Sequence, residues 1–267
     1  MANENTLDLD GQVAFVTGAG QGAGRAIALT LARHNAGGVA VNDFAPERAA
    51  AVVEELKAMG VPAVAAPADV GDHAAVSAAM AAASGALGPV TLLVNNAGNA
   101  GPGSNMGFAP PFWETGPDDW DRYLHTNLKG VMNCCHAALP GMVEEKRGRI
   151  VTIISDAGRI GEARLASYSA AKAGAAGFTR AIAREAGRYG ITANAVSLST
   201  LEPSMDEEEL AAFMASERTK NQLSRYTIRR FGKPQEVADM VLFLCSNSAA
   251  WITGQTYPVN GGYSFAQ

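Results

Sequence analysis

The sequence is poor in cysteine and has no basic run, and both absences narrow the range of functions. Its three cysteines, Cys134, Cys135 and Cys245, include an adjacent pair but no CxxC or metal-ligand spacing, so we expect reduced packing residues and no metal site. A formal net charge of −5 and the lack of a Lys/Arg run argue against a nucleic-acid partner, because such a protein needs a basic track for phosphates.

Long apolar runs are also missing. No run reaches the roughly 18 residues that a membrane-spanning helix needs. The first stretch, MANENTLDLDGQ, is acidic and polar, unlike a signal peptide. We therefore expect a cytoplasmic protein without a membrane partner.

What is present is ordinary globular composition: 267 residues, of which 48% are hydrophobic and 18% charged. Short β-rich runs alternate with Ala-rich helical stretches along the chain. There is no linker between them, and no repeat other than this strand–helix unit. The seven expected strands are residues 12–18, 38–43, 63–69, 91–97, 149–155, 191–197 and 256–260. Apolar strands separated by helices form a parallel sheet that is covered on both faces. We expect an α/β fold, a single doubly wound Rossmann-type domain over residues 1–267 with a sheet of about seven strands.

The first expected strand–helix junction, VAFVTGAGQGAGRAIALTLA, contains Gly18, Gly20, Gly22 and Gly24. Glycines there let the backbone turn tightly and approach a pyrophosphate, which the N-terminus of the next helix stabilises. Glycine clusters in loops are often only turns, so this motif depends on its context. We predict a dinucleotide site here, with Gln21 among its contacts.

Asp43 supplies that context. It ends the second expected strand 19 residues after Gly24, close to the offset of about 20 residues expected for a ribose-binding acid. A carboxylate there accepts a hydrogen bond from the adenosine 2′-hydroxyl and repels the 2′-phosphate of NADP. Neither Gln21 nor Phe44 offers a compensating cation. The alternative for Asp43 is a solvated strand end or a helix cap, and the balance favours NAD as the cofactor.

Two further strand ends fit a cofactor groove. Asp69 and Val70 close the third expected strand, and the run from Asn95 to Gly98 closes the fourth. Ligands of open α/β sheets lie outside the carboxyl ends of the strands, so both loops are expected to face one cleft. Each is weak evidence alone, because an Asp or Asn-Gly after a strand is also an ordinary turn.

The stretch ASYSAAKAG places Tyr168 and Lys172 four residues apart, on one face of a helix. A neighbouring ammonium favours the phenolate and moves the tyrosine pKa down from about 10 toward the working range of a base. Ser155, thirteen residues before Tyr168, ends the fifth expected strand and could fix a substrate oxygen against the tyrosine. A Tyr–Lys pair alone is commonly a surface pair, but the three residues together beside a nucleotide turn indicate chemistry.

The ordered motifs resemble those of the classical short-chain dehydrogenase/reductase family. TGAGQGAG is similar to the family's TGxxxGxG, and NNAG, Ser155 and the YxxxK of Tyr168 and Lys172 follow in order. Asn127, in HTNLKG, lies 28 positions before the serine, where the family keeps its fourth catalytic residue. The resemblance extends over residues 8–263 and includes a closing GQTYPVNGG.

The resemblance implies a role for each matched residue. Tyr168 would exchange a proton with the substrate oxygen while hydride moves to or from the nicotinamide, and Lys172 would hold the nicotinamide ribose and lower the tyrosine pKa. Ser155 would position the carbonyl, and Asn127 would anchor a water that relays protons. Asp69 and Val70 would flank the adenine, and Asn95 would lie on the side of its ribose. The other implied cofactor contacts are Gly18, Gln21, Gly22, Gly24, Asp43, Gly98, Tyr168, Lys172 and Thr200.

Two segments depart from the family pattern. Leu198 and Ser199 replace the usual Pro-Gly, and Pro203 stands where the family has a carboxamide-binding threonine, so that contact shifts to Thr200 or is lost. The loop 99–116 is longer than the family's, and its aromatic residues would wall the substrate site or form only a surface Ω-loop. The segment 199–228 is the expected substrate lid. Arg159, four residues after Ser155, could reach a substrate acid or a coenzyme A phosphate, although a solvated side chain is the simpler interpretation.

These features predict an NAD(H)-dependent oxidoreductase that interconverts a secondary alcohol and a ketone. The substrate would be a 3-hydroxyacyl thioester or a cyclic or aromatic alcohol. One alternative is a 3-oxoacyl-thioester reductase that uses NADPH. Alternatives from other classes are a redox-silent NAD-binding regulator and an epimerase or dehydratase. By resemblance, the assembly would be a homotetramer.

Overall fold

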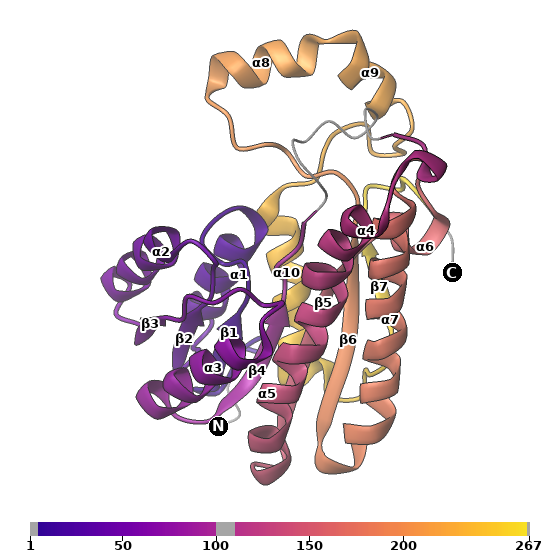
Figure 1. Ribbon diagram of the computed structural model, residues 1–267. Coiled ribbons are helices and arrows are strands. Elements are labelled where there is room, and N and C mark those ends of the chain that lie inside the picture. Colours follow the sequence, from indigo (N-terminus) through magenta and orange to yellow (C-terminus); the bar gives the residue numbers. More distant parts are fainter. Residues whose placement is uncertain (1–4, 100–109, 266–267) are drawn as a thin grey trace.

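The computed structural model describes residues 5–99 and 110–265, which build one parallel sheet between two layers of helices (Figure 1). The strands are β1 (Val13–Val16), β2 (Gly38–Val41), β3 (Ala63–Ala65), β4 (Val90–Asn95), β5 (Gly148–Ser155), β6 (Ile191–Leu198) and β7 (Thr256–Val259). All neighbouring strands are parallel, in the order β3-β2-β1-β4-β5-β6-β7. The predicted fold class and all seven expected strands are confirmed.

The helices follow the strands in alternation. They are α1 (Gly22–Arg33), α2 (Pro46–Ala58), α3 (His73–Leu87), α4 (Pro117–Leu124), α5 (Gly130–Glu144), α6 (Ala157–Ile160), α7 (Ala166–Ala186), α8 (Glu207–Ala215), α9 (Glu217–Leu223) and α10 (Pro234–Cys245). Apolar residues of α1, α2 and α10 form one core on one face of the sheet, and those of α3, α5 and α7 form the second core on the other. No helix in the described ranges is long and apolar enough to cross a membrane.

The strand order reverses beside β1, because β2 and β3 lie on one side of it and β4 to β7 on the other. At such a switch point the loops after neighbouring strands separate and leave a crevice at the carboxyl edge of the sheet. The glycine turn after β1, Asp43 after β2 and Ser155 at the end of β5 all lie along this edge. The topology therefore brings the predicted residues to one side of the molecule.

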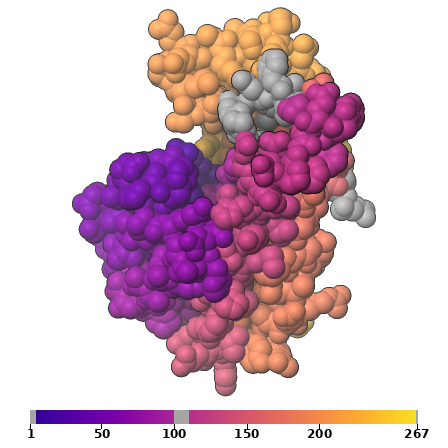
Figure 2. All heavy atoms as spheres, viewed as in Figure 1, coloured from indigo at the N-terminus to yellow at the C-terminus, as the bar shows by residue number. Residues whose placement is uncertain are grey.

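Helices α8 and α9 lie beyond that edge, outside the two layers (Figure 1). In the space-filling view they overhang the body and leave a notch above its N-terminal half (Figure 2). Asp206 and Ser216 cap the two helices, and each accepts a hydrogen bond from a backbone N–H in the first turn. The proposed lid segment is thus structured around two short capped helices.

The three cysteines are free and buried, as the sequence predicted. Burial raises the pKa of all three thiols, to about 12 for Cys135 and Cys245. A thiol with a raised pKa is a poor nucleophile, so these side chains act as packing residues.

Candidate active site

The glycine turn between β1 and α1 is closely packed. Gly18 has a φ of +59°, and a Cβ on it would lie 2.9 Å from the Cα of Ala97. A Cβ on Gly24 would clash with the carbonyl of Gly18. Helix α1 begins at Gly22 without a side-chain cap from Gln21 and without an acidic residue in its first turn. Uncapped N–H groups at a helix N-terminus attract an anion, so the turn fits the pyrophosphate of a dinucleotide.

Asn96 and Thr17 tie this turn to the loop after β4. The side-chain nitrogen of Asn96 donates to the carbonyl oxygens of Thr17 and Gly18, at 2.9 and 3.2 Å. The Thr17 hydroxyl accepts hydrogen bonds from the backbone N–H groups of Asn96 and Ala97, both at 2.9 Å. Sequence analysis singled out neither side chain, although both belong to its motifs.

The side chain of Asn95 packs into the core, so its expected place beside the adenosine ribose would depend on its backbone. Its Nδ2 lies 3.4 Å from the sulfur of Cys135, and its Oδ1 is buried without a hydrogen-bond partner among the described residues. Asn95 and Asn96 are adjacent at a strand end, where successive side chains point to opposite sides. Asn96 therefore holds the turn, and Asn95 packs into the core.

Asp69 and Val70 differ in their access to a ligand. The Asp69 carboxylate is exposed, accepts a hydrogen bond from the Gly71 N–H at 2.9 Å and lies 3.2 Å from Nε2 of His125. Val70 is buried, and its carbonyl accepts a hydrogen bond from Asn133. Asp69 can thus meet an adenine directly, whereas the Val70 side chain belongs to the core.

Asp43 has a cationic partner that sequence analysis missed. Its Oδ1 lies 2.8 Å from Nη2 of Arg48, and its two oxygens also accept hydrogen bonds from the N–H groups of Gly20 and Ala45. The carboxylate is only 3% exposed, so it is not a solvated strand end. Gln21 and Phe44 supply no cation to Asp43, but Arg48, in the first turn of α2, does, and the sequence analysis did not consider it.

Ser155, Tyr168 and Lys172 come together where β5 ends against α7. The Ser155 hydroxyl lies close enough to Tyr168 to lower its pKa, and its Oγ accepts a hydrogen bond from the N–H of Ala157 at 3.2 Å. The Lys172 nitrogen lies 5.9 Å from the centroid of the Tyr168 ring and donates to the carbonyl of Ile153 at 2.9 Å. The helix spacing therefore places the phenol and the ammonium on one face, as predicted.

Asn127 joins this group from a π-helical turn, His125–Lys129, between α4 and α5. Such turns are frequent at functional sites. Its Nδ2 donates to the carbonyls of Asn99 and Tyr123, at 2.8 and 3.0 Å, and its Oδ1 accepts from the Asn99 N–H at 3.1 Å. Gly98 lies between Asn127 and Lys172, since a Cβ on it would be 3.2 Å from Oδ1 of the first and 3.3 Å from Nζ of the second.

The pKa values of Tyr168 and Lys172 shift in opposite directions, and that of Tyr168 shifts against the expectation. Burial raises the pKa of Tyr168, an effect that the neighbouring Ser155 hydroxyl opposes and the nearby Tyr123 strengthens. Burial also lowers the pKa of Lys172 to about 8. The expected lowering of the tyrosine pKa by Lys172 is therefore not found in the protein alone.

A buried polar cluster lies directly behind Ser155. Asp156 accepts hydrogen bonds from Ser197 at 2.8 Å, Asn260 at 2.7 Å and Arg159 at 3.0 Å. Arg159 is only 11% exposed, so it is neither solvated nor open to a substrate acid as expected. The cluster joins the ends of β5, β6 and β7 beneath the site.

The segment that replaces the family's Pro-Gly is held by Tyr226. The Tyr226 hydroxyl lies 2.5 Å from the Ser199 hydroxyl and accepts from the Thr200 N–H at 3.2 Å. The Thr200 hydroxyl accepts from Gln222 of α9 at 2.9 Å. Thr200 is thus bound to helix α9, and its predicted contact with a carboxamide requires Gln222 to share the hydroxyl.

Of the aromatic loop 99–116, Phe108 lies outside the described residues. Phe112 stacks on Trp120 of α4 with ring centroids 5.2 Å apart, and Trp113 is 82% exposed. The described end of the loop therefore packs one ring against α4 and leaves the next on the surface.

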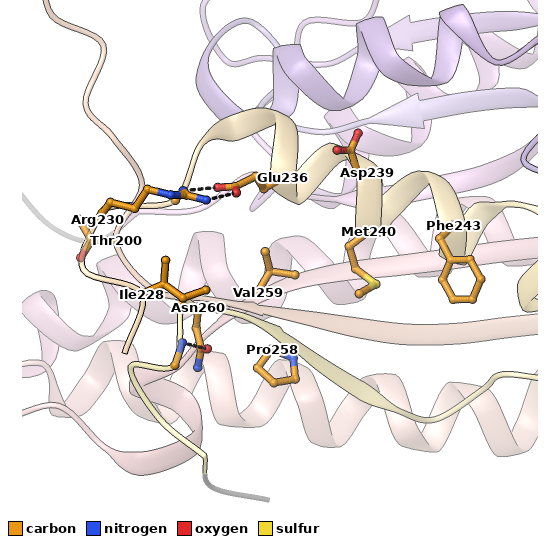
Figure 3. Close-up of a pocket in the computed structure, with 13 residues that line it drawn as sticks. Thr200, Ile228, Arg230, Glu236, Asp239, Met240, Phe243, Pro258, Val259 and Asn260 are labelled. Carbon is orange, nitrogen blue, oxygen red and sulfur yellow. Dashed lines mark hydrogen bonds and ion pairs between the residues drawn. The ribbon is translucent and has the colours of Figure 1, made fainter. Parts of the chain in front are cut away.

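A cavity of about 580 Å³ lies between α10 and β7 (Figure 3). Met240 and Phe243 of α10 and Pro258 and Val259 of β7 line it, and Thr200 lies at its rim. Arg230 and Glu236 form an ion pair across one end of it. Within the described ranges, none of the four candidate catalytic residues lines this cavity, so it is separate from the site around Tyr168.

Comparison with known proteins agrees with this geometry. The family model described as enoyl-(acyl carrier protein) reductase matches residues 18–264. The chain is 39% identical to the 3-oxoacyl-[acyl-carrier-protein] reductase FabG of Staphylococcus aureus over 250 residues, which cover 93% of this chain and 96% of that protein. It is 37% identical to the (2S)-[(R)-hydroxy(phenyl)methyl]succinyl-CoA dehydrogenase subunit BbsD of Thauera aromatica, over 97% of this chain and 98% of that one.

A solved structure gives the same result. The chain is similar to a gluconate 5-dehydrogenase from Burkholderia cenocepacia in complex with NADP and tartrate, with a TM-score of 0.87 and 30% identity, over 98% of this chain and 99% of that one. These relatives are oxidoreductases that share the fold along nearly the whole chain. This chain therefore belongs to the short-chain dehydrogenase/reductase family and is an oxidoreductase of alcohols and ketones with a nicotinamide cofactor.

Proposed function

We propose that this chain interconverts a secondary alcohol and a ketone with NAD(H), and that Tyr168 transfers the proton. The observation that carries the proposal is the placement of Tyr168 between the Ser155 hydroxyl, which lies close enough to lower its pKa, and the buried Lys172. A phenol and a hydroxyl that are neighbours can both reach one substrate oxygen. A few side chains that transfer the proton and position the substrate are sufficient, because the cofactor supplies the hydride chemistry.

Each residue has a physical task in this reaction. The bound nicotinamide supplies or accepts the hydride. Ser155 donates a hydrogen bond to the substrate oxygen and holds it near Tyr168, whose O–H gives up its proton in reduction and regains it in oxidation. The ammonium of Lys172 stabilises the negative charge that develops on the phenol oxygen. Asn127, fixed by three backbone hydrogen bonds, holds the loop at Gly98 and Asn99 against Lys172.

We propose NAD as the preferred cofactor because of Asp43. The carboxylate stands at the end of β2, beside the glycine turn, where it can accept a hydrogen bond from a ribose hydroxyl. The proposed contacts along the rest of the cofactor are the glycine turn, Asp69 at the adenine, and Tyr168 and Lys172 at the nicotinamide ribose.

For the substrate we propose a 3-hydroxyacyl thioester, with a cyclic or aromatic alcohol as the alternative. The relative from Thauera aromatica is named as a subunit of the dehydrogenase of an aromatic hydroxyacyl-CoA, which combines both descriptions. The charges of the lid segment have both signs, and Lys220, Arg225 and the nearby Arg230 pair with Glu217, Glu162 and Glu236. The proposal for the substrate is therefore supported by the similarity to this relative and not by the charge of the lid.

A second candidate is reduction of a 3-oxoacyl thioester with NADPH. The relative from Staphylococcus aureus is named for the reduction of 3-oxoacyl groups on an acyl carrier protein. The ion pair between Arg48 and Asp43 adds a cation where a 2′-phosphate would lie. The two candidates differ in direction and cofactor, not in the residues that move the proton.

Nicotinamide absorbance, followed in both directions with a substrate panel, tests these proposals. The panel contains aromatic and aliphatic 3-hydroxyacyl-CoAs, cyclic alcohols, aryl alcohols and 3-oxoacyl thioesters, each with NAD(H) and NADP(H). Oxidation of a hydroxyacyl-CoA with NAD supports the first candidate, and exclusive reduction with NADPH supports the second. Dinucleotide binding without turnover of any substrate would instead favour a redox-silent regulator or an epimerase.

We also propose a homotetramer. The strand β7 is the last of the sheet, and the fully exposed Trp251 lies shortly before it in the chain. A sheet edge and an exposed aromatic side chain are both typical of surfaces that another chain covers. Light scattering coupled to size-exclusion chromatography will distinguish four copies of the 27.6 kDa chain from one or two.

A further inference from the structure

Residues 260–264, the C-terminal segment, follow β7 and run along the end of the lid segment. The N–H of Ile228 donates to the carbonyl of Gly261 at 2.8 Å, and the Thr227 hydroxyl donates to the carbonyl of Gly262 at 3.2 Å. Both glycines have a positive φ, +60° and +73°, and a Cβ on Gly262 would lie 2.7 Å from Cβ of Thr227. The two segments are therefore in close contact, which glycine permits at these positions.

Tyr226 joins the two ends of the lid segment to each other. Its side chain is buried, and its hydroxyl contacts the hydroxyl of Ser199 and the N–H of Thr200, where the lid segment begins. The Tyr263 ring of the C-terminal segment packs against it, with centroids 5.1 Å apart. The C-terminal segment thus supports the base of the lid.

The Glu162 carboxylate receives a group from each of these two segments. The Tyr263 hydroxyl donates to its Oε2 at 2.8 Å, and Nη1 of Arg225 lies 3.8 Å from its Oε1. The Arg225 guanidinium also lies 4.7 Å from the centroid of the Tyr263 ring. Burial and the neighbouring Glu162 raise the pKa of Tyr263 to about 12, so the phenol keeps its proton and remains a donor at neutral pH.

The same contacts reach the two elements that carry the candidate catalytic residues. Glu162 lies in the turn before α7, and its N–H donates to the hydroxyl of Ser169, the neighbour of Tyr168, at 3.3 Å. On the other side, Asn260 donates to Asp156, directly after β5, at 2.7 Å. The end of the lid segment is therefore attached both to β5 and to the beginning of α7.

We propose that Glu162 and Tyr263 are positioning residues for the substrate: they fix the end of the lid segment relative to Tyr168, so that α8 and α9 stand over the substrate site (Figure 1). The inference rests on the proposed function and adds to it two residues that touch neither cofactor nor reacting atoms. A hydrogen bond to a carboxylate is stronger than a neutral one, and a segment fixed in advance costs less entropy to order when a ligand binds. Loss of this contact should weaken substrate binding and spare the dinucleotide.

Limited trypsin digestion tests the hold on the lid without turnover. Arg218 and Lys220 lie within α9, so cleavage after them requires this helix to open locally. Tyr263→Phe removes the donated hydrogen bond but keeps the ring, and it should raise the rate of cleavage at these two sites by about 3- to 10-fold. Glu162→Gln should act in the same direction, because it removes the charge that Arg225 faces.

Steady-state kinetics with the substrate found in the panel, together with calorimetric titration with NAD, give the second measurement. In Tyr263→Phe and Glu162→Gln the KM of the substrate should rise by about 3- to 10-fold, while kcat and the dissociation constant of NAD change by less than about threefold. A residue that supports only the fold would instead lower the thermal stability and weaken both ligands together.

Tyr189→Phe provides the matched control. Arg188 lies over the Tyr189 ring at 4.8 Å, much as Arg225 lies over that of Tyr263, but this pair precedes β6, at the opposite edge of the sheet. The control should leave the cleavage of α9 and the KM unchanged. The double variant Tyr263→Phe/Glu162→Gln should fall short of the product of the two single effects, because both changes weaken one shared contact.

The outcomes are separable. An unchanged rate of cleavage in α9 or an unchanged KM in Tyr263→Phe would overturn the assignment. So would equal weakening of substrate and NAD, which indicates a structural role. If the unmodified chain turns over no substrate, the proposed function itself fails, and the digestion still decides whether Tyr263 and Glu162 hold the lid.

Discussion

The Lys172 ammonium is held by the carbonyl of Ile153, 2.9 Å away, and lies 5.9 Å from the centroid of the Tyr168 ring. The side chain is only 4% exposed. One neutral acceptor does not replace the hydration that a cation loses on burial, which is why the pKa of Lys172 falls to about 8. The chain thus tolerates an unfavourable buried charge beside its candidate proton donor.

Replacing Lys172 with Met should therefore stabilise the protein while abolishing its activity. Folding lowers the pKa from 10.5 to about 8, so the charge is most costly below pH 8 and costs nothing above the unfolded pKa. We expect the variant to gain on the order of 1–3 kcal/mol of unfolding free energy at pH 7, less what the unpaired Ile153 carbonyl costs. The gain should shrink as the pH rises from 8 to 10.5.

Urea denaturation at several pH values measures this effect. Lys57→Met, which removes an exposed lysine, serves as the control and should show no such pH-dependent gain. A Lys172→Met protein less stable than the unmodified chain at pH 7 would contradict the argument.

Tyr168→Phe should abolish turnover and leave dinucleotide binding nearly intact. The change removes only the hydroxyl that Ser155 contacts. General acid–base catalysis contributes typically 10²- to 10⁴-fold, so kcat should fall by about this factor. Tyr123→Phe is the matched control, because the Tyr123 ring packs edge-on against that of Tyr168 at 6.0 Å. Comparable losses of activity in both variants would argue for packing and against proton transfer.

The sheet and the candidate catalytic residues could be predicted because local patterns determine them. Buried parallel strands appear as continuous apolar runs, and glycine turns mark where they end. The spacing of Tyr168 and Lys172 places them on one helical face whatever surrounds them. Such features depend only on residues that are close together in the sequence, so they can be predicted from one sequence.

The environment of these residues could not be predicted in the same way. Whether Asn95 or Asn96 faces the cleft depends on the pleat of one strand end, which a shift of one residue reverses. Arg48 meets Asp43 only because α2 begins where it does. The direction of the Tyr168 pKa shift depends mainly on how deeply the phenol is buried. The spacing in the sequence shows only that the charge of Lys172 is near.

Gly98→Ala should lower kcat without unfolding the protein. The added methyl group would approach Asn127 and Lys172 at 3.2 and 3.3 Å, closer than ordinary contacts, and would displace one of them. A displacement near 1 Å at reacting groups can cost about 100-fold in rate, so we expect a loss of roughly 10- to 100-fold. Steady-state kinetics and thermal unfolding measure the two effects separately.

Gly85→Ala provides the matched control for that substitution. Gly85 lies within α3, and a Cβ there meets no atom within 4 Å. Alanine in a helix is favoured over glycine by about 1 kcal/mol, so this variant should be somewhat more stable and fully active. If Gly98→Ala were equally active, the tight contact with Asn127 and Lys172 would not matter to the reaction.

Asp156→Ala should be the most destabilising of these substitutions. It leaves Arg159 buried without its carboxylate and removes the acceptor of Ser197 and Asn260. Breaking a buried ion pair from one side typically costs about 3–5 kcal/mol.

A double-mutant cycle with Asp156→Ala and Arg159→Met separates the pair from the rest of the cluster. Removing both charges should recover part of the loss, because no uncompensated cation then remains buried. The same cycle on the exposed pair Lys57–Glu54 should give a coupling energy below about 1 kcal/mol. A coupling at Asp156 and Arg159 no larger than this would mean that the cluster holds the strand ends through its neutral hydrogen bonds alone.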